Sequence, residues 1–276
     1  MSSDKLSTKK FRYSPLTRYG RFLIRKINKA FKEFDLISPG DNVCVSVSGG
    51  KDSLSLLHLL LEHKRFYPSD FTVSAVHVVS DHNPEAGRLR DYLEAMFERL
   101  NIGYGFVEME ITKDIEGNDA EPSCFWCAWK RRETVFRYCV ENGMNKLAFG
   151  HHADDVAETT LLNLVFHGTL DTILPKRTFF GGAFDVIRPL FYIREKELVR
   201  YAEMAGFETT SCSCPNEDLG KRRVMKRLVR DLTKESRQLH ANFWRAARIW
   251  HETIGDRKLH TTPREEPPEQ PEAESW

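Results

Sequence analysis

The chain has 276 residues, of which 41% are apolar and 29% charged, a composition typical of a globular protein with a substantial core. No apolar run approaches the roughly 18 residues that a membrane-spanning helix needs, and residues 1–20 lack the apolar segment of a signal peptide. We therefore expect a cytoplasmic protein that makes no use of a membrane.

The charges are unevenly distributed, although the formal net charge is only +1. Residues 1–32 contain ten Lys or Arg and a single acid, and residues 219–230 contain six more basic side chains. The acidic tail of residues 264–276, with five Glu and one Arg, masks this basic body in the total. Two basic segments suit a polyanionic partner, while solvated helix faces are the alternative for either segment alone.

Hydrophobic periodicity predicts strands alternating with helices along most of the chain. The expected strands are 42–47, 71–79, 104–111 and 146–150. The expected helices are 18–33, 53–63, 85–100, 130–142, 154–166, 194–205, 219–233 and 240–254. Such alternation predicts an α/β fold with a doubly wound, mostly parallel sheet, followed by a helical C-terminal region.

The same pattern suggests four segments. Residues 1–38 form a basic helical segment, 39–190 a nucleotide-binding and catalytic domain, and 191–259 a helical C-terminal region. Residues 260–276 are rich in Pro and Glu and have almost nothing to bury, so we expect an acidic disordered tail.

The turn SGGKDS (residues 48–53) connects the first expected strand to an apolar helix. Two glycines allow the backbone amides to face one centre, Lys51 adds a positive charge, and Ser48 and Ser53 add hydroxyls at a helix N-terminus. These features predict an anion cradle. The turn departs from the ordinary P-loop because its glycines are adjacent and Asp52 follows the lysine.

Four of the six cysteines form two close pairs, Cys124 with Cys127 and Cys212 with Cys214. In a protein without a secretion signal, such pairs indicate a metal or redox site in preference to disulfides. From spacing alone, a structural zinc site with all four thiolates is one interpretation. Cys44 and Cys139 lie among apolar neighbours in expected elements and are interpreted as core residues.

The sequence GHHADD (residues 150–155) follows an expected strand directly, so its side chains should emerge at the same sheet edge as residues 48–53. Asp154 or Asp155 could hold Mg²⁺ on nucleotide phosphates or orient a substrate. For His151 and His152, a catalytic role and a packing or capping role both remain open.

These motifs together resemble a known family. The turn SGGKDS is similar to the PP-loop of the ATP pyrophosphatase superfamily, whose members cleave ATP between the α and β phosphates. With the CFWC, GHHADDVAET and CSCP motifs added, the chain resembles the tRNA 2-thiocytidine synthetase family (TtcA) over roughly residues 11–255.

The resemblance implies ATP-dependent replacement of the C2 oxygen of a tRNA cytidine by sulfur, and it assigns residues to each part of the site. The nucleotide-binding set is Ser48, Gly49, Gly50, Lys51, Asp52, Ser53, His77, Gly150 and Asp154. The catalytic set is Lys51, Asp52, Arg131 and Asp155. Three cysteines, Cys124, Cys127 and Cys214, would hold a [4Fe-4S] cluster. Because this chain has C-x-C where the family commonly has C-x-x-C, Cys212 competes with Cys214 for the third position.

The implied partners are tRNA, ATP with Mg²⁺, a sulfur donor such as a cysteine desulfurase, and a second copy of the chain in a homodimer. A tRNA 2-thiouridine synthetase of the TtuA type is the alternative within the same chemistry, although its usual zinc-finger cysteine pairs at both chain ends have no counterpart here. A zinc-stabilised, non-catalytic module that binds ATP or RNA is the alternative from a different class.

Overall fold

A computed structural model describes residues 17–67, 70–81, 85–110, 124–209 and 221–253; of Cys124 and Phe125 it describes only the backbone. The helices are α1 (Arg18–Phe34), α2 (Lys51–Phe66), α3 (Ala86–Leu100), α4 (Cys124–Glu141), α5 (Ala153–His167), α6 (Glu195–Ala205), α7 (Lys221–Glu235) and α8 (Leu239–Thr253). The strands are β1 (Asn42–Ser46), β2 (Thr72–Ser80), β3 (Gly103–Met109), β4 (Lys146–Ala148), β5 (Lys176–Phe179) and β6 (Phe184–Ile187).

The strands form one six-stranded sheet in the order β3-β2-β1-β4-β6-β5. All neighbouring pairs are parallel except β5 and β6, which are antiparallel. The prediction of a doubly wound, mostly parallel α/β fold is therefore confirmed. The strand order reverses between β1 and β4, and ligands of such sheets bind in the crevice beyond the carboxyl ends of the strands at this reversal.

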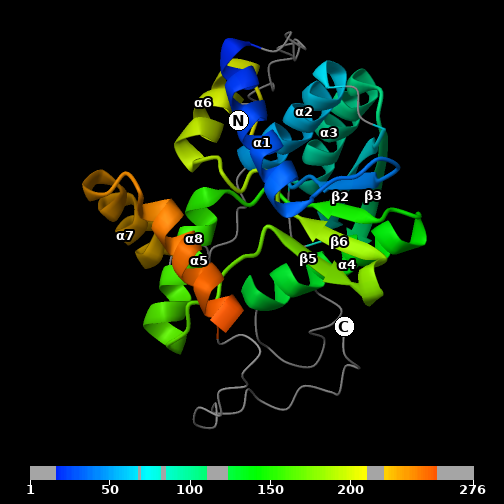
Figure 1. Ribbon diagram of the computed structural model, residues 1–276. Helices are drawn as coiled ribbons and strands as arrows, with labels where there is room; N and C mark the ends of the chain where they lie inside the picture. Colours follow the sequence, from blue (N-terminus) through cyan, green and yellow to red (C-terminus); the bar gives the residue numbers. More distant parts are fainter. Residues whose placement is uncertain (1–16, 68–69, 82–84, 111–123, 210–220, 254–276) are drawn as a thin grey trace, which may run out of the picture.

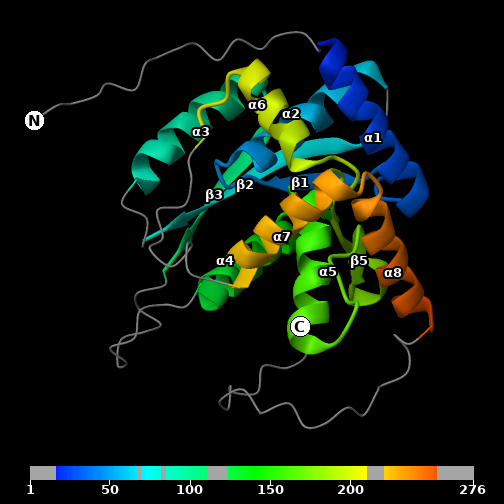
Figure 2. The same ribbon diagram turned by 90° about the vertical axis from the view of Figure 1, so that its left-hand side faces the viewer.

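The sheet is covered on both faces (Figures 1 and 2). Helices α1, α2, α3 and α6 lie over one face, and α4 lies against the other. Side chains of β1 alternate accordingly, because Val43 and Val45 pack with the first group of helices while Cys44 packs with α4. Cys44 and Cys139 are both fully buried, which confirms that they pack in the core.

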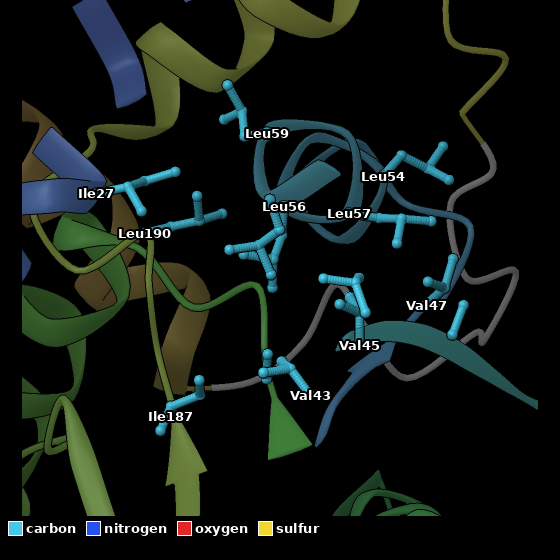
Figure 3. Close-up of a cluster of buried hydrophobic side chains, with 14 of the residues drawn as sticks. Ile27, Val43, Val45, Val47, Leu54, Leu56, Leu57, Leu59, Ile187 and Leu190 are labelled. Carbon is cyan, nitrogen blue, oxygen red and sulfur yellow. The ribbon is translucent and has the colours of Figure 1, made fainter. Parts of the chain in front are cut away.

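The larger core lies between the sheet and α2, whose leucines, apart from the partly buried Leu61, are almost entirely buried (Figure 3). Each fully buried leucine contributes about 1.5–3 kcal/mol of stabilisation. Ile27 of α1 and Leu198 of α6 belong to the same core as Val45 of β1. These contacts fix both helices relative to the sheet edge that carries residues 48–53. The proposed division of the chain into four segments stays a prediction.

Two local features differ from the expected pattern. Helix α4 begins at Cys124, whereas the sequence predicted a start at residue 130. The short antiparallel pair β5–β6 was not predicted; its strands have four residues each and are joined through residues 180–183, which include two glycines with positive φ.

Among the described helices, none combines the length and the hydropathy required to cross a membrane.

Candidate active site at the strand-order reversal

The turn after β1 forms a compact loop at the N-terminus of α2. The Ser48 N–H donates to Ser53 Oγ at 3.1 Å, and the Ser53 hydroxyl donates to the Gly50 carbonyl at 3.0 Å. Gly49 has φ of 85°, a conformation that favours glycine. Since α2 starts at Lys51, the amides of this turn lie at the positive end of a helix. The turn therefore has the geometry expected of an anion cradle.

Gly150, directly after β4, lies against this turn. A Cβ atom at Gly150 would lie 3.0 Å from the Ser53 backbone nitrogen and 3.1 Å from the Asp52 carbonyl carbon. Only a residue without a side chain permits that approach without displacement of the cradle backbone. The turns after β1 and β4 thus meet at one edge of the sheet, as the sequence predicted.

His152 and Asp155 form the start of α5. The His152 N–H donates to Asp155 Oδ2 at 2.8 Å, so Asp155 caps the helix that carries it. The His152 ring is buried, with Nε2 3.9 Å from Asp52 Oδ1. Burial lowers the pKa of neighbouring His151 to about 4. The backbone of His152 thus orients the Asp155 carboxylate, while a catalytic role for either histidine stays open.

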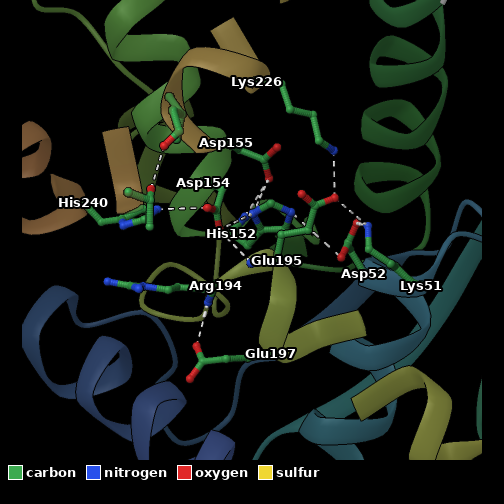
Figure 4. Close-up of polar contacts among 12 residues, drawn as sticks. Lys51, Asp52, His152, Asp154, Asp155, Arg194, Glu195, Glu197, Lys226 and His240 are labelled. Atoms are coloured by element: carbon green, nitrogen blue, oxygen red, sulfur yellow. Dashed lines mark hydrogen bonds and ion pairs between the residues drawn. The ribbon is translucent and has the colours of Figure 1, made fainter. Parts of the chain in front are cut away.

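Asp154 connects three helices. Its Oδ2 accepts the backbone N–H of Glu195 at 2.6 Å, and its Oδ1 is 2.9 Å from His240 Nε2 (Figure 4). Burial raises the pKa of Asp154, but the hydrogen bonds with His240 and the Glu195 backbone outweigh it and lower the pKa to about 2. Both carboxylate oxygens are engaged, so Asp154 holds α5, α6 and α8 together at the site.

Lys51 is held by two carboxylates. Its ammonium lies 3.0 Å from Asp52 Oδ2 and 3.1 Å from Glu195 Oε1, and the same Glu195 oxygen accepts from Lys226 at 2.7 Å (Figure 4). Burial lowers the pKa of Lys51, but the two carboxylates outweigh it and raise that pKa. Lys51 is therefore fully charged at neutral pH.

The cysteine-bearing helix reaches the same region through His77 and Arg131. The His77 Nδ1 is 2.6 Å from the carbonyl of Val47, the residue before the cradle. Burial is the main cause of the lowered pKa of His77, and the charge of Arg131 lowers it further. Arg131 in turn donates to Cys127 Sγ at 3.7 Å. The charge of Arg131 is thus close enough to act on His77, beside the cradle, while its guanidinium contacts the cysteine motif.

The described part of the cysteine site fits a thiolate-held cluster. Because α4 begins at Cys124, Cys124 and Cys127 occupy positions i and i+3 in its first turn, and such positions share one helix face. A helix N-terminus and a neighbouring guanidinium both favour the thiolate form that ligates iron. The Cys127 side chain is half-buried. Cys212 and Cys214 lie outside the described residues.

Magnesium would have to be held by few protein ligands. In the part of the chain that the structure describes, no group of three or more His, Cys, Asp or Glu side chains is arranged to hold a metal ion. Mg²⁺ at nucleotide sites is usually bound through one or two carboxylates together with substrate phosphates. Asp155, beside the cradle, fits that limited role better than Asp154, whose oxygens are both engaged.

Three residues of the site were missed by sequence reasoning: Glu195, Lys226 and His240. Glu195 is the first residue of α6, and Lys226 lies in a basic segment that was assigned only a general attraction to polyanions. Glu195 contacts Lys51, 144 residues away, His240 contacts Asp154, 86 residues away, and Lys226 contacts Glu195, 31 residues away. No local pattern encodes such contacts.

The sheet topology and the glycine-rich cradle define an α/β nucleotide-binding protein of the PP-loop class. The family described as "PP-loop domain" matches residues 21–232. A tRNA-cytidine(32) 2-sulfurtransferase of Acinetobacter baumannii is 33% identical over 242 residues, which cover 86% of this chain and 79% of the relative. The protein of the same name from Citrifermentans bemidjiense is 37% identical over 220 residues, covering 76% of this chain and 83% of the relative.

The comparison of structures agrees with the sequence comparison. The U34-tRNA thiolase NcsA from Methanococcus maripaludis, solved with its [4Fe-4S] cluster, superimposes with a TM-score of 0.72 at 25% identity, covering 86% of this chain and 80% of NcsA. The chain belongs to the PP-loop family and, within it, to the family of the tRNA-cytidine(32) 2-sulfurtransferases. The resemblance drawn from the motifs is thereby confirmed.

Proposed function

We propose that this protein is an ATP-dependent tRNA sulfurtransferase that replaces the C2 oxygen of a cytidine with sulfur. One observation supports the assignment beyond family membership: the cradle and the Gly150 turn meet at the strand-order reversal, and the charge of Arg131 on α4 acts on His77, which lies against the residue before the cradle. A base at this edge would have an ATP-binding turn on one side and a cysteine helix on the other. Thiolation of a base needs both.

The first step is activation of the base by adenylation. The cytidine O2 attacks the α phosphorus of ATP, the bond to the β phosphate breaks, and pyrophosphate leaves. The cradle amides of residues 48–53 and the ammonium of Lys51 would bind this leaving group. Asp155 would orient the base or hold Mg²⁺ on the phosphates, and Arg131 would offset negative charge that develops on the phosphate oxygens.

The second step exchanges oxygen for sulfur. A hydrosulfide adds to C2 of the adenylated base and releases its proton, the C2–O bond breaks, and AMP leaves. A [4Fe-4S] cluster held by Cys124, Cys127 and Cys214 would supply the sulfide through an iron that carries no protein ligand. Arg131, which donates to Cys127 Sγ, would keep that thiolate oriented and charged. The competition between Cys212 and Cys214 for the third position stays open.

The RNA must present a splayed base, because a stacked base cannot reach both halves of the site. Helix α7 brings basic side chains to the rim of the site, and Lys226 reaches Glu195 from there. We expect the basic residues of 5–32 and 221–230 to contact tRNA phosphates, so affinity should fall steeply with salt. The sulfur donor and the homodimer stay predictions.

The assignment is tested by anaerobic purification followed by counting of iron, zinc and acid-labile sulfide per chain. The purified protein is then incubated with ATP, sulfide and unmodified tRNA, and the nucleosides are analysed by mass spectrometry. We expect a four-iron cluster and 2-thiocytidine. One zinc without sulfide, together with no pyrophosphate release, would establish the zinc-stabilised binding module instead.

Uridine thiolation is the second candidate, and the likeness to NcsA, named as a U34-tRNA thiolase, favours it. The two candidates share ATP, cluster and sulfide, but their products differ. Formation of 2-thiouridine without 2-thiocytidine in the same nucleoside analysis would replace the cytidine assignment. The greater identity to relatives named for cytidine(32) supports cytidine as the substrate.

A further inference from the structure

Glu195 joins two lysines from different parts of the chain. Its Oε1 accepts from Lys51 at 3.1 Å and from Lys226 at 2.7 Å. Because both ammoniums bond to one oxygen, their nitrogens lie within about 6 Å of each other, a typical span for two donors on one phosphate group. Figure 4 shows Lys226 pointing from α7 towards Glu195, with Lys51 on the other side of that carboxylate.

This arrangement is electrostatically balanced only while the carboxylate is present. Two ammoniums about 6 Å apart repel each other, and Glu195 lies between them as a shared counter-charge. Burial works against the charge of Glu195, but Lys226 and Lys51 outweigh it and lower the pKa of the carboxyl. A phosphate oxygen carries the same charge and accepts the same hydrogen bonds, so it can replace the carboxylate between the lysines.

Lys226 and Glu195 line a cleft that is large enough for phosphate groups. A cleft of about 630 Å³ opens between α5, α6 and α7, and it is lined by Asp154, Glu158, Arg194, Glu195, Lys226 and Arg230. Glu195, one of its lining residues, is in contact with the cradle lysine Lys51. The cleft therefore lies next to Lys51, on the side of Glu195 that faces the basic helix α7.

We propose that Lys226 is a second phosphate-binding lysine of the ATP site, and that Glu195 is a positioning residue that occupies the phosphate position until the nucleotide displaces it. The proposal rests on the ATP-dependent function proposed above and extends it to residues of α6 and α7. When ATP binds, phosphate oxygens bridge Lys51 and Lys226, which draws α7 onto the nucleotide. The pyrophosphate formed in the reaction stays bridged by the same two ammoniums.

The proposal is tested by calorimetric titration of the full-length holoprotein with pyrophosphate and with a non-hydrolysable ATP analogue, both with Mg²⁺ and without RNA. Lys226→Gln should weaken both affinities about tenfold, the effect of losing one charge-assisted hydrogen bond. Lys226→Arg should recover most of that affinity. Glu195→Gln should bind both ligands more tightly than the wild type, because the competing carboxylate is gone.

Lys234→Gln is the matched control, since Lys234 is also on α7 and, within the described part of the chain, pairs with Asp231 on the surface. It should bind both ligands with wild-type affinity. Thermal unfolding of each variant separates a folding defect from a binding defect, and Lys226→Arg keeps the test informative if Lys226→Gln unfolds.

Three results would overturn the proposal. The first is wild-type affinity of Lys226→Gln for both ligands. The second is weaker binding by Glu195→Gln, which would make the network purely structural. The third, from a separate titration with tRNA, is a loss of tRNA affinity by Lys226→Gln with wild-type affinity for pyrophosphate and the ATP analogue, which would assign Lys226 to the RNA backbone. The titrations measure binding without sulfur transfer, so their outcome is independent of whether the protein thiolates cytidine.

Discussion

The close approach of Gly150 to the cradle makes Gly150→Ala a direct test of the site geometry. The added methyl group would lie 3.0 Å from the Ser53 nitrogen and 3.1 Å from the Asp52 carbonyl carbon. Ordinary contacts of a methyl carbon begin near 3.5 Å. Both neighbours are backbone atoms of the cradle and the first turn of α2, so relief requires a shift of the cradle by a few tenths of an ångström.

The expected cost follows from overpacking of a well-packed region, which is typically about 1–3 kcal/mol. The displaced atoms include the Ser53 amide, one of the proposed donors to phosphate. We therefore expect Gly150→Ala to lose about 1–3 kcal/mol in the free energy of unfolding and about tenfold in affinity for pyrophosphate. Urea denaturation measures the first effect, and calorimetric titration measures the second.

Gly87→Ala is the matched control. Gly87 lies in the first turn of α3, where an added Cβ meets nothing within 4 Å and φ is not positive. The change should leave pyrophosphate affinity unchanged and stabilise the protein by up to about 1 kcal/mol, since alanine favours helix. Wild-type stability and affinity of Gly150→Ala would refute the close packing of the two turns.

Further predictions concern a buried ion pair, a titrating carboxyl and a cradle hydroxyl. Lys146→Met removes the ammonium from buried Asp41 and leaves Asp185 with Lys176 as its remaining partner. Urea denaturation should therefore show a loss of about 3 kcal/mol, and a loss below about 1 kcal/mol would contradict the importance of Lys146. The pKa of Glu158 is raised from 4.5 to about 7, chiefly by burial. The contribution of this carboxyl to the free energy of unfolding is therefore complete below pH 4.5 and is lost as the pH rises through 7. Glu158→Gln should remove that decline. The difference in free energy of unfolding between pH 5 and pH 8 should then be smaller than in the wild type by about 1 kcal/mol after solvent screening. An unchanged pH profile of urea unfolding would disprove the raised pKa of Glu158. Ser53→Ala removes a hydroxyl that bonds to two backbone groups of the cradle and should cost about 1 kcal/mol in the urea assay, with weaker pyrophosphate binding by calorimetry; unaltered binding would show that the hydroxyl does not order the turn.

The strands and helices around the cradle were predictable because each carries a strong local signal. The β-branched run that became β1, the glycines after it and the leucine-rich α2 give one consistent pattern. The parallel arrangement then placed Gly150 at the same edge as the cradle without further information. The sequence therefore predicted by residue number which two turns meet at this edge, and their role in binding ATP stays a prediction.

The remaining features depend on contacts that local patterns do not encode. The first turn of α4 contains aromatic and cysteine residues, which are weak helix formers, so periodicity alone began the helix too late. The four-residue strands β5 and β6 are too short for alternation to be distinguished from a loop. The place of Glu195 in the site could not be predicted from local sequence, because its partners are Lys51, 144 residues away, and Lys226, 31 residues away.

The central claim is that the cytidine oxygen itself attacks ATP before sulfur arrives. It can be tested with an RNA substrate that carries ¹⁸O at C2 of the target cytidine, incubated with the anaerobic holoprotein, ATP and sulfide. The account predicts that each 2-thiocytidine formed is matched by one AMP that carries the ¹⁸O label. Unlabelled AMP alongside 2-thiocytidine would contradict the account, because the base would then have lost its oxygen without adenylation.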